Sequence, residues 1–474
     1  MVNIITRDQH MDGRRTQARV MYGSYNTQKY MINNGFKTGK LSTFISLNHD
    51  RTDGHRNNSD FHITNGFGKI GYELNENLKI TGDVSIAKFY NENPGPLQKP
   101  ITDYWVDVLR GTTSYALENN FGKTSGALRV FYNWGSHEVN DGYYPNTNEK
   151  QNTPRTYLFR SLDHNTGVLL YQTFRLLPGN SFTLGIDYKN WGGEAWNKNN
   201  DGTRTDIIDT SINEVAGYLI MQQDLFEKLS INAGVRYEHN EEYGSEWVPQ
   251  VGLTYRPVES NVIKASLSKG FRSPNLRELY LYDPANPNLN PERMLNYEVS
   301  VGQSLLENKL YFELTGFFID GKDMIQTGMV DGKPLNMNTG SFINKGIELE
   351  AHYHILQNLS VNMNYSYLHT DKELVAAPKN KFVANATYKP GRFTINMNVQ
   401  SINGLYISPI SGSDLLKEDC TTLNAKVSYL FGTRDKGLNV FLKGENLTAT
   451  RYQVIGEGYW MPKAIFMGGF DITF

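Results

Sequence analysis

Apolar and polar residues alternate with a period of two along almost the whole chain, and this alternation limits the possible folds more than any other feature. In the last segment, residues 463–474, one face carries Phe466, Phe470 and Ile472, whereas Asp471 falls on the other. Successive side chains of a strand point to opposite faces, so such a segment suits a strand between lipid and a polar lumen. A soluble core would not accept Glu348 and Glu350 unpaired on one face. The pattern therefore predicts an all-β transmembrane barrel.

Composition excludes several other classes. The chain has 474 residues, a formal charge of −2 and a mean hydropathy of −0.51. No run approaches the roughly 18 consecutive apolar residues of a membrane helix, which excludes a helical membrane protein. The near-neutral charge gives no nucleic-acid footprint. Cys420 is the only cysteine, so no intrachain disulfide can form.

The connections between the predicted strands are of two kinds, which alternate along the chain. The tight ones are 37–40, 75–77, 119–123, 178–180, 225–228, 257–261, 306–308, 356–358, 390–391 and 432–436. The others are mostly long and rich in Asn, Gly and Pro, and include a short one near Ser24 and 51–60, 91–101, 136–154, 192–209, 272–293, 321–340, 403–418 and 446–462. Ten tight turns and eleven such connections require 22 strands. The fold expected is thus a 22-stranded antiparallel transmembrane β-barrel with short periplasmic turns and long extracellular loops, a size associated with plugged transporters.

Several motifs, in order along the chain, resemble one known family, the TonB-dependent outer-membrane receptors. The segment Phe271-Arg272-Ser273-Pro274, followed by 276–280 and by 286–292, is similar to the family's FRAP/NPNL region. Gly444-Glu445-Asn446-Leu447, followed by Arg451-Tyr452, resembles the element before the final strand, and Phe474 matches the terminal aromatic residue. The resemblance implies a receptor of the bacterial outer membrane, in contact with outer-membrane lipid.

The resemblance also implies a domain organisation. Members of the family carry a plug domain before the barrel, and residues 2–7 look like the end of its last strand. We therefore expect residues 1–14 to be a remnant of a plug and residues 15–474 to form the barrel. The contact with the TonB complex would then belong to a plug domain that is not present in this chain.

Candidate ligand-binding residues are aromatic and basic residues of the predicted outer connections. Receptors of this family bind ferric siderophores, haem or cobalamin, and such ligands stack on aromatic rings or pair with arginine. The candidates are Tyr143, Tyr144, Trp191, Trp196, Arg272, Tyr280 and Tyr282. The alternative for the aromatic residues is a place in the interfacial girdles of the barrel, and for Arg272 a role in holding the Pro-rich connection.

No resident metal or cofactor is predicted. His55, His62, His137 and His239 lie in or near outer connections and are candidates for haem iron, but lone loop histidines are usually solvated. His352 and His354 share a face without an evident third ligand, so a structural role is favoured. The Asn- and Asp-rich stretch 197–203 does not have the spacing of a calcium loop.

The function expected is high-affinity uptake of a large, scarce nutrient, with a ferric siderophore first, cobalamin second and haem third. No spacing of Ser, His and Asp singles out a catalytic triad, so an enzyme is not expected. The alternative from another class is an open diffusion pore without a plug.

Overall fold

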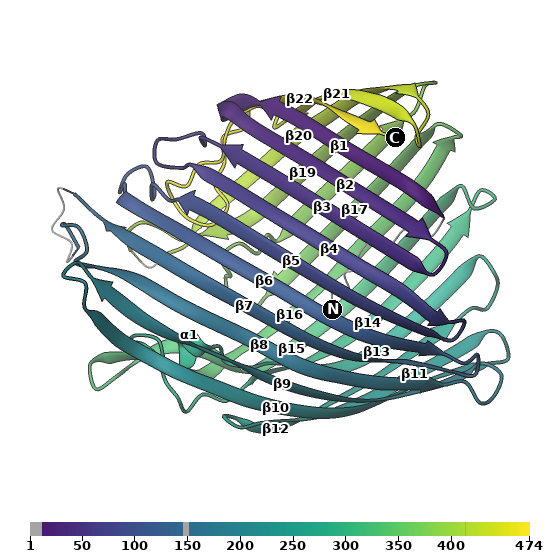
Figure 1. The fold of residues 1–474 in the computed structure, drawn as a ribbon, viewed down its shortest axis with the longest axis horizontal. Coiled ribbons are helices and arrows are strands. Elements are labelled where there is room, and N and C mark those ends of the chain that lie inside the picture. Colours follow the sequence, from purple (N-terminus) through teal and green to yellow (C-terminus); the bar gives the residue numbers. More distant parts are fainter. Residues whose placement is uncertain (1–11, 146–150, 413) are drawn as a thin grey trace.

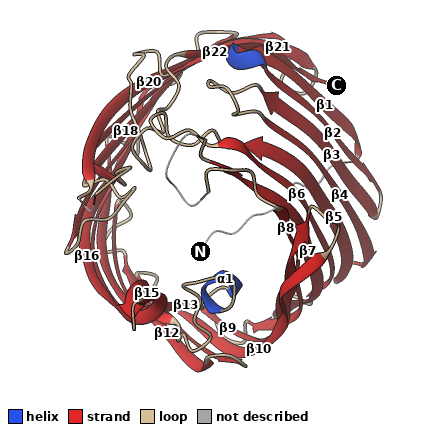
Figure 2. Ribbon diagram, turned by 90° about the vertical axis from the view of Figure 1, so that its left-hand side faces the viewer, coloured by secondary structure: helices blue, strands red, loops and turns tan. Residues whose placement is uncertain are grey.

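The computed structural model describes residues 12–145, 151–412 and 414–474. Its strands form one closed antiparallel barrel, shown from the side in Figure 1 and end-on in Figure 2. The ring closes where β1 pairs with β22, in a register that runs from Gln17–Thr473 to Gly23–Met467. The described residues contain 22 strands, as the alternating connections predicted.

The strands follow one another around the ring, each paired with its neighbours in the sequence. Their bounds are β1 Gly13–Gly23, β2 Thr27–Thr38, β3 Leu41–Thr52, β4 Phe61–Asn75, β5 Leu78–Glu92, β6 Thr102–Asn120, β7 Thr124–Tyr143, β8 Tyr157–Phe174, β9 Asn180–Asn199, β10 Arg204–Leu225, β11 Leu229–Asn240, β12 Gly244–Tyr255, β13 Asn261–Arg272, β14 Glu292–Leu305, β15 Leu310–Val330, β16 Lys333–Leu356, β17 Leu359–Thr370, β18 Asn380–Tyr388, β19 Phe393–Ile407, β20 Leu416–Gly432, β21 Gly437–Glu445 and β22 Ile465–Thr473. A 3-10 turn, η1 (Ser24–Asn26), and one short helix, α1 (Leu276–Leu279), complete the regular elements.

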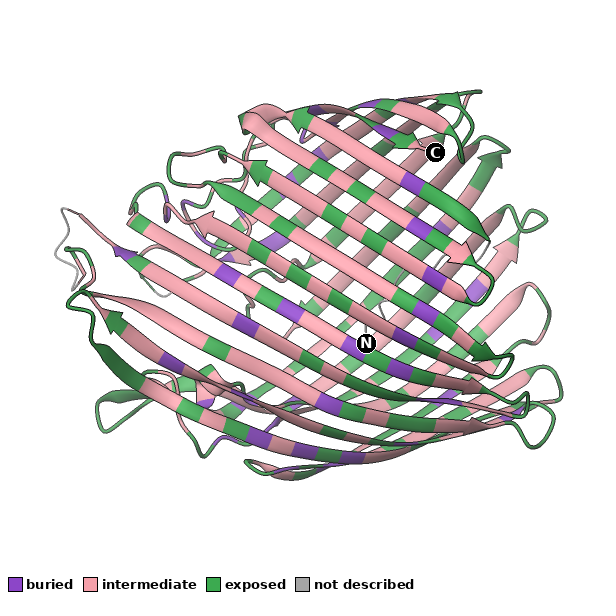
Figure 3. Ribbon diagram, in the orientation of Figure 1, coloured by how far each residue is buried: buried purple, intermediate pink, exposed green. Residues whose placement is uncertain are grey.

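The two faces of the wall differ as the period of two requires. On β22, Phe466 is 60% exposed and Phe470 is 43% exposed, whereas Asp471, which points to the other face, is only 9% exposed. The Asp471 carboxylate accepts a hydrogen bond from Arg19 of β1 across the closing seam. The resulting bands of exposed and less exposed residues cross the strands in Figure 3. On β22 the outward side chains are thus apolar, and the inward carboxylate of Asp471 is paired.

All ten tight turns lie at one end of the barrel, here called the turn end, and the longer connections lie at the other, the loop end. Two predicted loops are largely strand, and a third is strand in its first part. β9 and β10 continue through most of 192–209, β15 and β16 fill most of 321–340, and β7 extends to Tyr143. Asn, Asp and Gly permit turns but do not prevent cross-strand pairing, so these hairpins continue beyond the height of a membrane.

The predicted division at residue 15 falls close to the start of the barrel. β1 begins at Gly13, and of the expected remnant at 1–14, residues 1–11 lie outside the described part of the structure. No helix among the described residues is long and apolar enough to cross a membrane.

Candidate functional site

The connection between β13 and β14, residues 273–291, folds inward at the loop end. Figure 2 shows its helix α1 inside the ring of strands, next to β9, β10 and β13. Asn275 caps this helix: its side chain accepts a hydrogen bond from the Glu278 backbone N–H at 3.0 Å, and the Glu278 carboxylate accepts one from the Asn275 N–H at 2.9 Å. This reciprocal arrangement satisfies backbone donors that a helix N-terminus leaves free.

Apolar side chains fix the inward segment to the wall. Leu279 of α1 and Leu289 are 1% and 3% exposed, and they form a buried cluster with Ile212 of β10, which is 0% exposed. Trp191 of β9 and Tyr280 pack against this cluster. Because burying a leucine side chain contributes about 1.5–3 kcal/mol, these contacts are the main force that holds the segment in the lumen.

Arg272, the last residue of β13, ties the segment to its own strands. Its Nη1 and Nη2 atoms donate to the two carboxylate oxygens of Glu278 at 2.9 and 3.0 Å. Its Nε donates to Glu292 at 2.6 Å, at the start of β14. Both ends of the connection are thus joined through one guanidinium, whose donors are taken by carboxylates of the protein.

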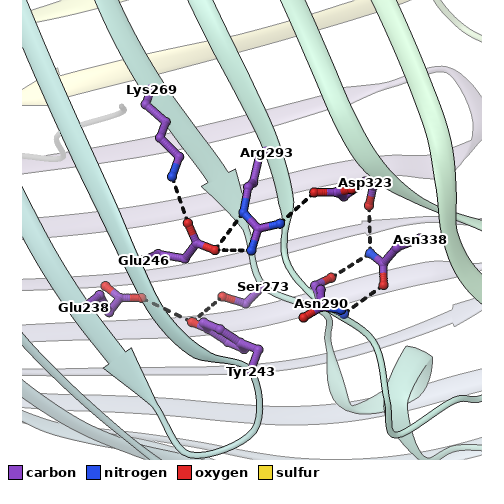
Figure 4. A network of polar contacts seen from close by, with 9 residues as sticks. All are labelled: Glu238, Tyr243, Glu246, Lys269, Ser273, Asn290, Arg293, Asp323 and Asn338. Carbon is purple, nitrogen blue, oxygen red and sulfur yellow. Dashed lines mark hydrogen bonds and ion pairs between the residues drawn. The ribbon is translucent and has the colours of Figure 1, made fainter.

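A second polar network, drawn in Figure 4, closes a gap in the wall below this segment. β12 and β13 pair through their backbones only from Gln250–Ser268 to Tyr255–Ile263. Toward the loop end the link is made by side chains: the carboxylate of Glu246, 4% exposed, accepts hydrogen bonds from Lys269 Nζ at 2.9 Å and from Arg293 Nε at 2.7 Å. Ion pairs thus take the place of ladder hydrogen bonds there.

The same network holds the ends of the inward segment. Ser273 donates to the Tyr243 hydroxyl at 2.8 Å, and that hydroxyl donates to Glu238 at 3.2 Å. Asn290 and Asn338 exchange two hydrogen bonds of 2.8 Å, from the Asn290 N–H to Oδ1 and from Asn338 Nδ2 to the Asn290 carbonyl. Burial, with the nearby carboxylates of Glu238 and Glu214, raises the pKa of Tyr243 well above its ordinary value, so the hydroxyl stays protonated and can donate.

A cavity of about 470 Å³ lies between α1 and the facing wall of β6 to β10. Its walls combine aromatic, acidic and basic side chains: Tyr104, Phe159, Tyr282, His137, Asp163 and Arg277. The ring centroids of Tyr282 and Phe159 are 6.2 Å apart, and the Tyr282 hydroxyl donates to Asn197 Oδ1 at 3.3 Å. The size falls in the range of small-molecule sites.

One arginine that lines this cavity, Arg277, and one that contacts its lining residues, Arg110, differ in their partners. Arg110 of β6 donates to Asp163 at 2.6 Å and lies 2.8 Å from His137 Nε2. Arg277, on α1, forms no hydrogen bond or ion pair through its side chain with any residue that the structure describes. Within the described ranges, Arg277 thus has no carboxylate partner that would compete with a bound anion, whereas Arg110 has Asp163.

Three of the residues singled out from the sequence come together at this site. Trp191 and Tyr280 pack on the α1 cluster, and Tyr282 lines the cavity. Burial and the hydrogen-bonded carboxylate of Glu242 raise the pKa of Tyr280 to about 12, so this phenol is neutral at physiological pH. Burial also raises the pKa of Tyr282.

The other candidates lie elsewhere. Trp196 is five residues beyond Trp191 on β9, and the pairing of β9 with β8 has no register shift. Because side chains alternate along a strand, Trp196 faces the opposite way from Trp191, away from the lumen. There the Arg204 guanidinium lies 4.1 Å from its ring centroid. Tyr143 ends β7, and Tyr144 starts the next connection, with Lys99 Nζ 4.6 Å from its ring centroid.

Reasoning from the sequence overlooked Arg277, Tyr104 and Asp163. Arg277 stands inside a motif that drew attention to Arg272, and the two look alike as sequence. The signal that separates them is the pattern Asn275-x-x-Glu278, a capping box that places a carboxylate next to Arg272.

Several of the histidines weighed as metal ligands have protein partners. His55 Nε2 lies 2.8 Å from the Trp460 carbonyl oxygen, and His239 Nδ1 lies 3.0 Å from Ser245 Oγ. The His62 ring stacks on Tyr90, and His352 bonds to Asn362 and Glu350. The described residues contain no group of three His, Cys, Asp or Glu side chains placed to hold a metal ion.

The Asn- and Asp-rich stretch 197–203 forms hydrogen bonds within itself. Asp201 Oδ1 accepts hydrogen bonds from the Thr203 backbone N–H at 2.9 Å and from its hydroxyl at 2.6 Å. The carbonyl of Thr203 accepts one from the Asn199 N–H at 2.9 Å. The Asp201 carboxylate thus stabilises the turn between β9 and β10.

Comparison with protein families gives one match that covers most of the chain. The family model described as "TonB dependent receptor-like, beta-barrel" matches residues 42–447.

Comparison with curated proteins gives more distant relatives. The iron-regulated outer membrane virulence protein of Vibrio cholerae is 23% identical over 100% of this chain and 76% of its own length. The vitamin B12 transporter BtuB of Photobacterium profundum is 25% identical over 44% of this chain and 35% of its own length.

Solved structures share the architecture. The copper transporter OprC superimposes with a TM-score of 0.83 at 15% identity, over 99% of this chain and 81% of that one. The siderophore receptor PiuA from Acinetobacter baumannii gives 0.81 at 12% identity, over 98% of this chain and 82% of that one. At such low identities the likeness concerns the fold alone.

Proposed function

The chain belongs to the TonB-dependent receptor-like β-barrel family, and we propose that its substrate is a ferric siderophore. The family and its neighbours are receptors and transporters of the bacterial outer membrane, so the chain is an outer-membrane transport protein and not an enzyme. Its loop end then faces the outside of the cell and its turn end the periplasm.

The observation that carries the proposal is the cavity beside α1. It combines the rings of Tyr104, Phe159 and Tyr282 with the guanidinium of Arg277, which has no ion-pair partner among the described residues. Ferric siderophores are often anionic, and many carry flat aromatic groups. An aromatic wall with an arginine suits such a ligand, since rings stack and a guanidinium pairs with oxygen anions.

Two further observations support a chelate over the other substrates. A relative that spans the whole chain is named for its regulation by iron. Direct haem ligation lacks support, because His55, His62, His137 and His239 already contact protein groups. Cobalamin stays the second candidate, since other relatives are vitamin B12 transporters.

On this proposal the wall and the inward segment supply ligand contacts. Energy from the TonB complex would act through a plug domain seated in the lumen. Trp191, Tyr280, Tyr282 and Arg277 are the proposed contacts around α1, and Tyr143 and Tyr144 are proposed to meet the ligand as it enters. Arg272 is proposed to act by holding α1, and Trp196 is not proposed as a contact because it faces outward.

The test is a binding titration with purified protein. A ferric catecholate siderophore, a ferric hydroxamate siderophore, cobalamin and haemin are each added while tryptophan fluorescence is followed. We expect saturable quenching by a ferric siderophore, reduced when Trp191 is replaced by Phe. Saturation by cobalamin or haemin alone would assign a different substrate. Large, steady single-channel conductance without saturable binding would instead support the open diffusion pore.

A further inference from the structure

An apolar groove of about 930 Å³ runs along the outward face of β12 to β17. The outward direction of its side chains follows from the register of the paired strands. Ile212 faces α1 in the lumen, and the pairings from β10 to β14 place Val251, Leu267 and Val299 on the opposite face. These three side chains are 39–56% exposed.

The groove exists because small residues stand between large ones. Ala265 and Gly316 lie beside Val299, and a methyl group on Gly316 would meet nothing within 4 Å. Around them rise the larger side chains of Tyr297 and Phe318. The wall of a barrel is convex overall, so a local depression of this size is a feature of its own and not a consequence of the fold.

Two basic residues line the groove toward the loop end. Lys345 of β16 and His369 of β17 are directly opposite each other in the antiparallel register. Neither forms an ion pair with a residue in the described ranges.

Acidic side chains also lie near this rim. Asp320 is opposite Ile343, two residues above Lys345 on the same face, and Asp371 follows β17. The lining of the groove includes Lys345, His369 and Glu298 but neither aspartate. Glu298 is next to the outward-facing Val299 on β14, so its side chain is on the lumen side. His369 adds to the positive charge when it is protonated.

The height of this basic pair matches a membrane boundary. Lys345 is eleven residues above Leu356, the turn end of β16. At about 3.3 Å per residue and a tilt of about 45°, this separation is roughly 25 Å along the membrane normal. The apolar band of an outer-membrane barrel is also about 25 Å tall. Lys345 and His369 therefore stand where the headgroups of the outer leaflet begin.

We propose that this groove binds one lipid of the outer leaflet that carries a phosphorylated headgroup. The acyl chain lies over Ala265 and Gly316, and the phosphate pairs with Lys345 and His369. Apolar lipid contact is common to the whole outward face. The depression, together with two basic groups that have no ion pair with any described residue, distinguishes this site. The groove lies on the outward face of β12 to β17, whereas the cavity beside α1 lies in the lumen against β6 to β10, so this proposal is independent of the substrate.

The test measures lipid retention by native mass spectrometry of the purified protein in detergent. The probes are diphosphoryl lipid A and the same lipid after enzymatic removal of its phosphates. We expect one bound molecule of the phosphorylated form. With both Lys345 and His369 protonated it should be retained about 25-fold better than the dephosphorylated form, because each basic residue near an anionic headgroup contributes about fivefold. The double variant Lys345→Gln/His369→Gln should lose this preference.

Two further variants separate the parts of the site. Gly316→Leu fills the groove and should weaken retention of both lipids. Lys264→Gln/His352→Gln makes the same chemical change on the lumen side of β13 and β16, where Lys264 pairs with Glu313, and should leave retention unchanged. Heat-modifiable migration on gels checks folding of each variant. Equal retention of both lipids by the wild type, unchanged preference in the Lys345/His369 variant, or a dimer in place of the lipid adduct would overturn the proposal.

Discussion

Arg272 and Glu278 form an ion pair with two parallel hydrogen bonds of 2.9 and 3.0 Å, across only six residues of sequence. The same carboxylate accepts the backbone N–H of Asn275 and thereby caps α1. One acidic side chain thus joins the end of β13 to the helix that lines the α1 cavity. The position of the proposed ligand contacts depends on this pair.

Replacing Arg272 with Gln should loosen the segment 273–291 and leave the barrel intact. Arg272 is 42% exposed, so each ion pair is screened and contributes about 1 kcal/mol or less. We expect faster amide hydrogen exchange in α1 and weaker ligand binding, with an almost unchanged urea midpoint. Lys264→Gln breaks a similarly exposed pair lower on β13 and is the control. Unchanged exchange in α1 would show that Arg272 does not hold the segment.

Replacing Glu246 with Gln should open the wall between β12 and β13. Lys269 and Arg293 would lose a buried anionic partner, which costs about 1–3 kcal/mol. We expect a lower urea midpoint and faster exchange in 244–249. The matched control is Glu313→Gln: it removes a carboxylate that pairs with Lys264, in a region where the strands are fully paired. If exchange in 244–249 rises equally in both variants, the ion pairs are not what closes the gap.

Replacing Arg277 with Gln should weaken ligand binding without affecting folding. Its guanidinium has no partner among the described residues, so its loss leaves no protein group unpaired. A hydrogen bond to a charged group contributes about 1.5–3 kcal/mol, so we expect the Kd of an anionic ferric siderophore to rise roughly 10- to 150-fold. The same change at Arg434, in a turn at the opposite end, is the control. Wild-type affinity of the Arg277 variant would remove this residue from the site.

The hydroxyl of Tyr280 should ionise only near pH 12. Burial and the Glu242 carboxylate disfavour the phenolate, and they raise the pKa of Tyr280 to about 12 from an ordinary value of 10.0. Because the folded pKa is raised, the stabilisation from this group is complete below pH 10 and is lost as the pH rises toward 12. Ultraviolet titration of the wild type minus that of Tyr280→Phe isolates the transition. A difference spectrum with its midpoint near pH 10 would contradict the assigned surroundings.

The period of two predicted the wall because it is a local property of each strand. The outward positions of Phe466 and Phe470 and the inward position of Asp471 follow from alternation alone, and the structure confirms them. The strand count followed from the connections. The lengths of β9 and β10 could not be read in the same way, since pairing across a hairpin depends on two segments at once.

The candidate site was predicted less completely, for different reasons. The same alternation separates Trp191 from Trp196, because five residues along a strand reverse the face. The inward fold of α1, by contrast, depends on Leu279 and Leu289 meeting Ile212, more than sixty residues away in the sequence. Arg277 became distinct from Arg272 only when Glu278 and Glu292 were placed in space.

Uptake of radioactive iron by iron-starved cells tests the central claim most directly. Cells with the gene intact or deleted, and with the TonB complex intact or deleted, are given an anionic ferric siderophore labelled with ⁵⁵Fe. The account predicts uptake that requires both the gene and the TonB complex and that falls in the Arg277→Gln variant. Uptake that persists without the TonB complex, or that is the same with the gene deleted for every ferric siderophore offered, would contradict it.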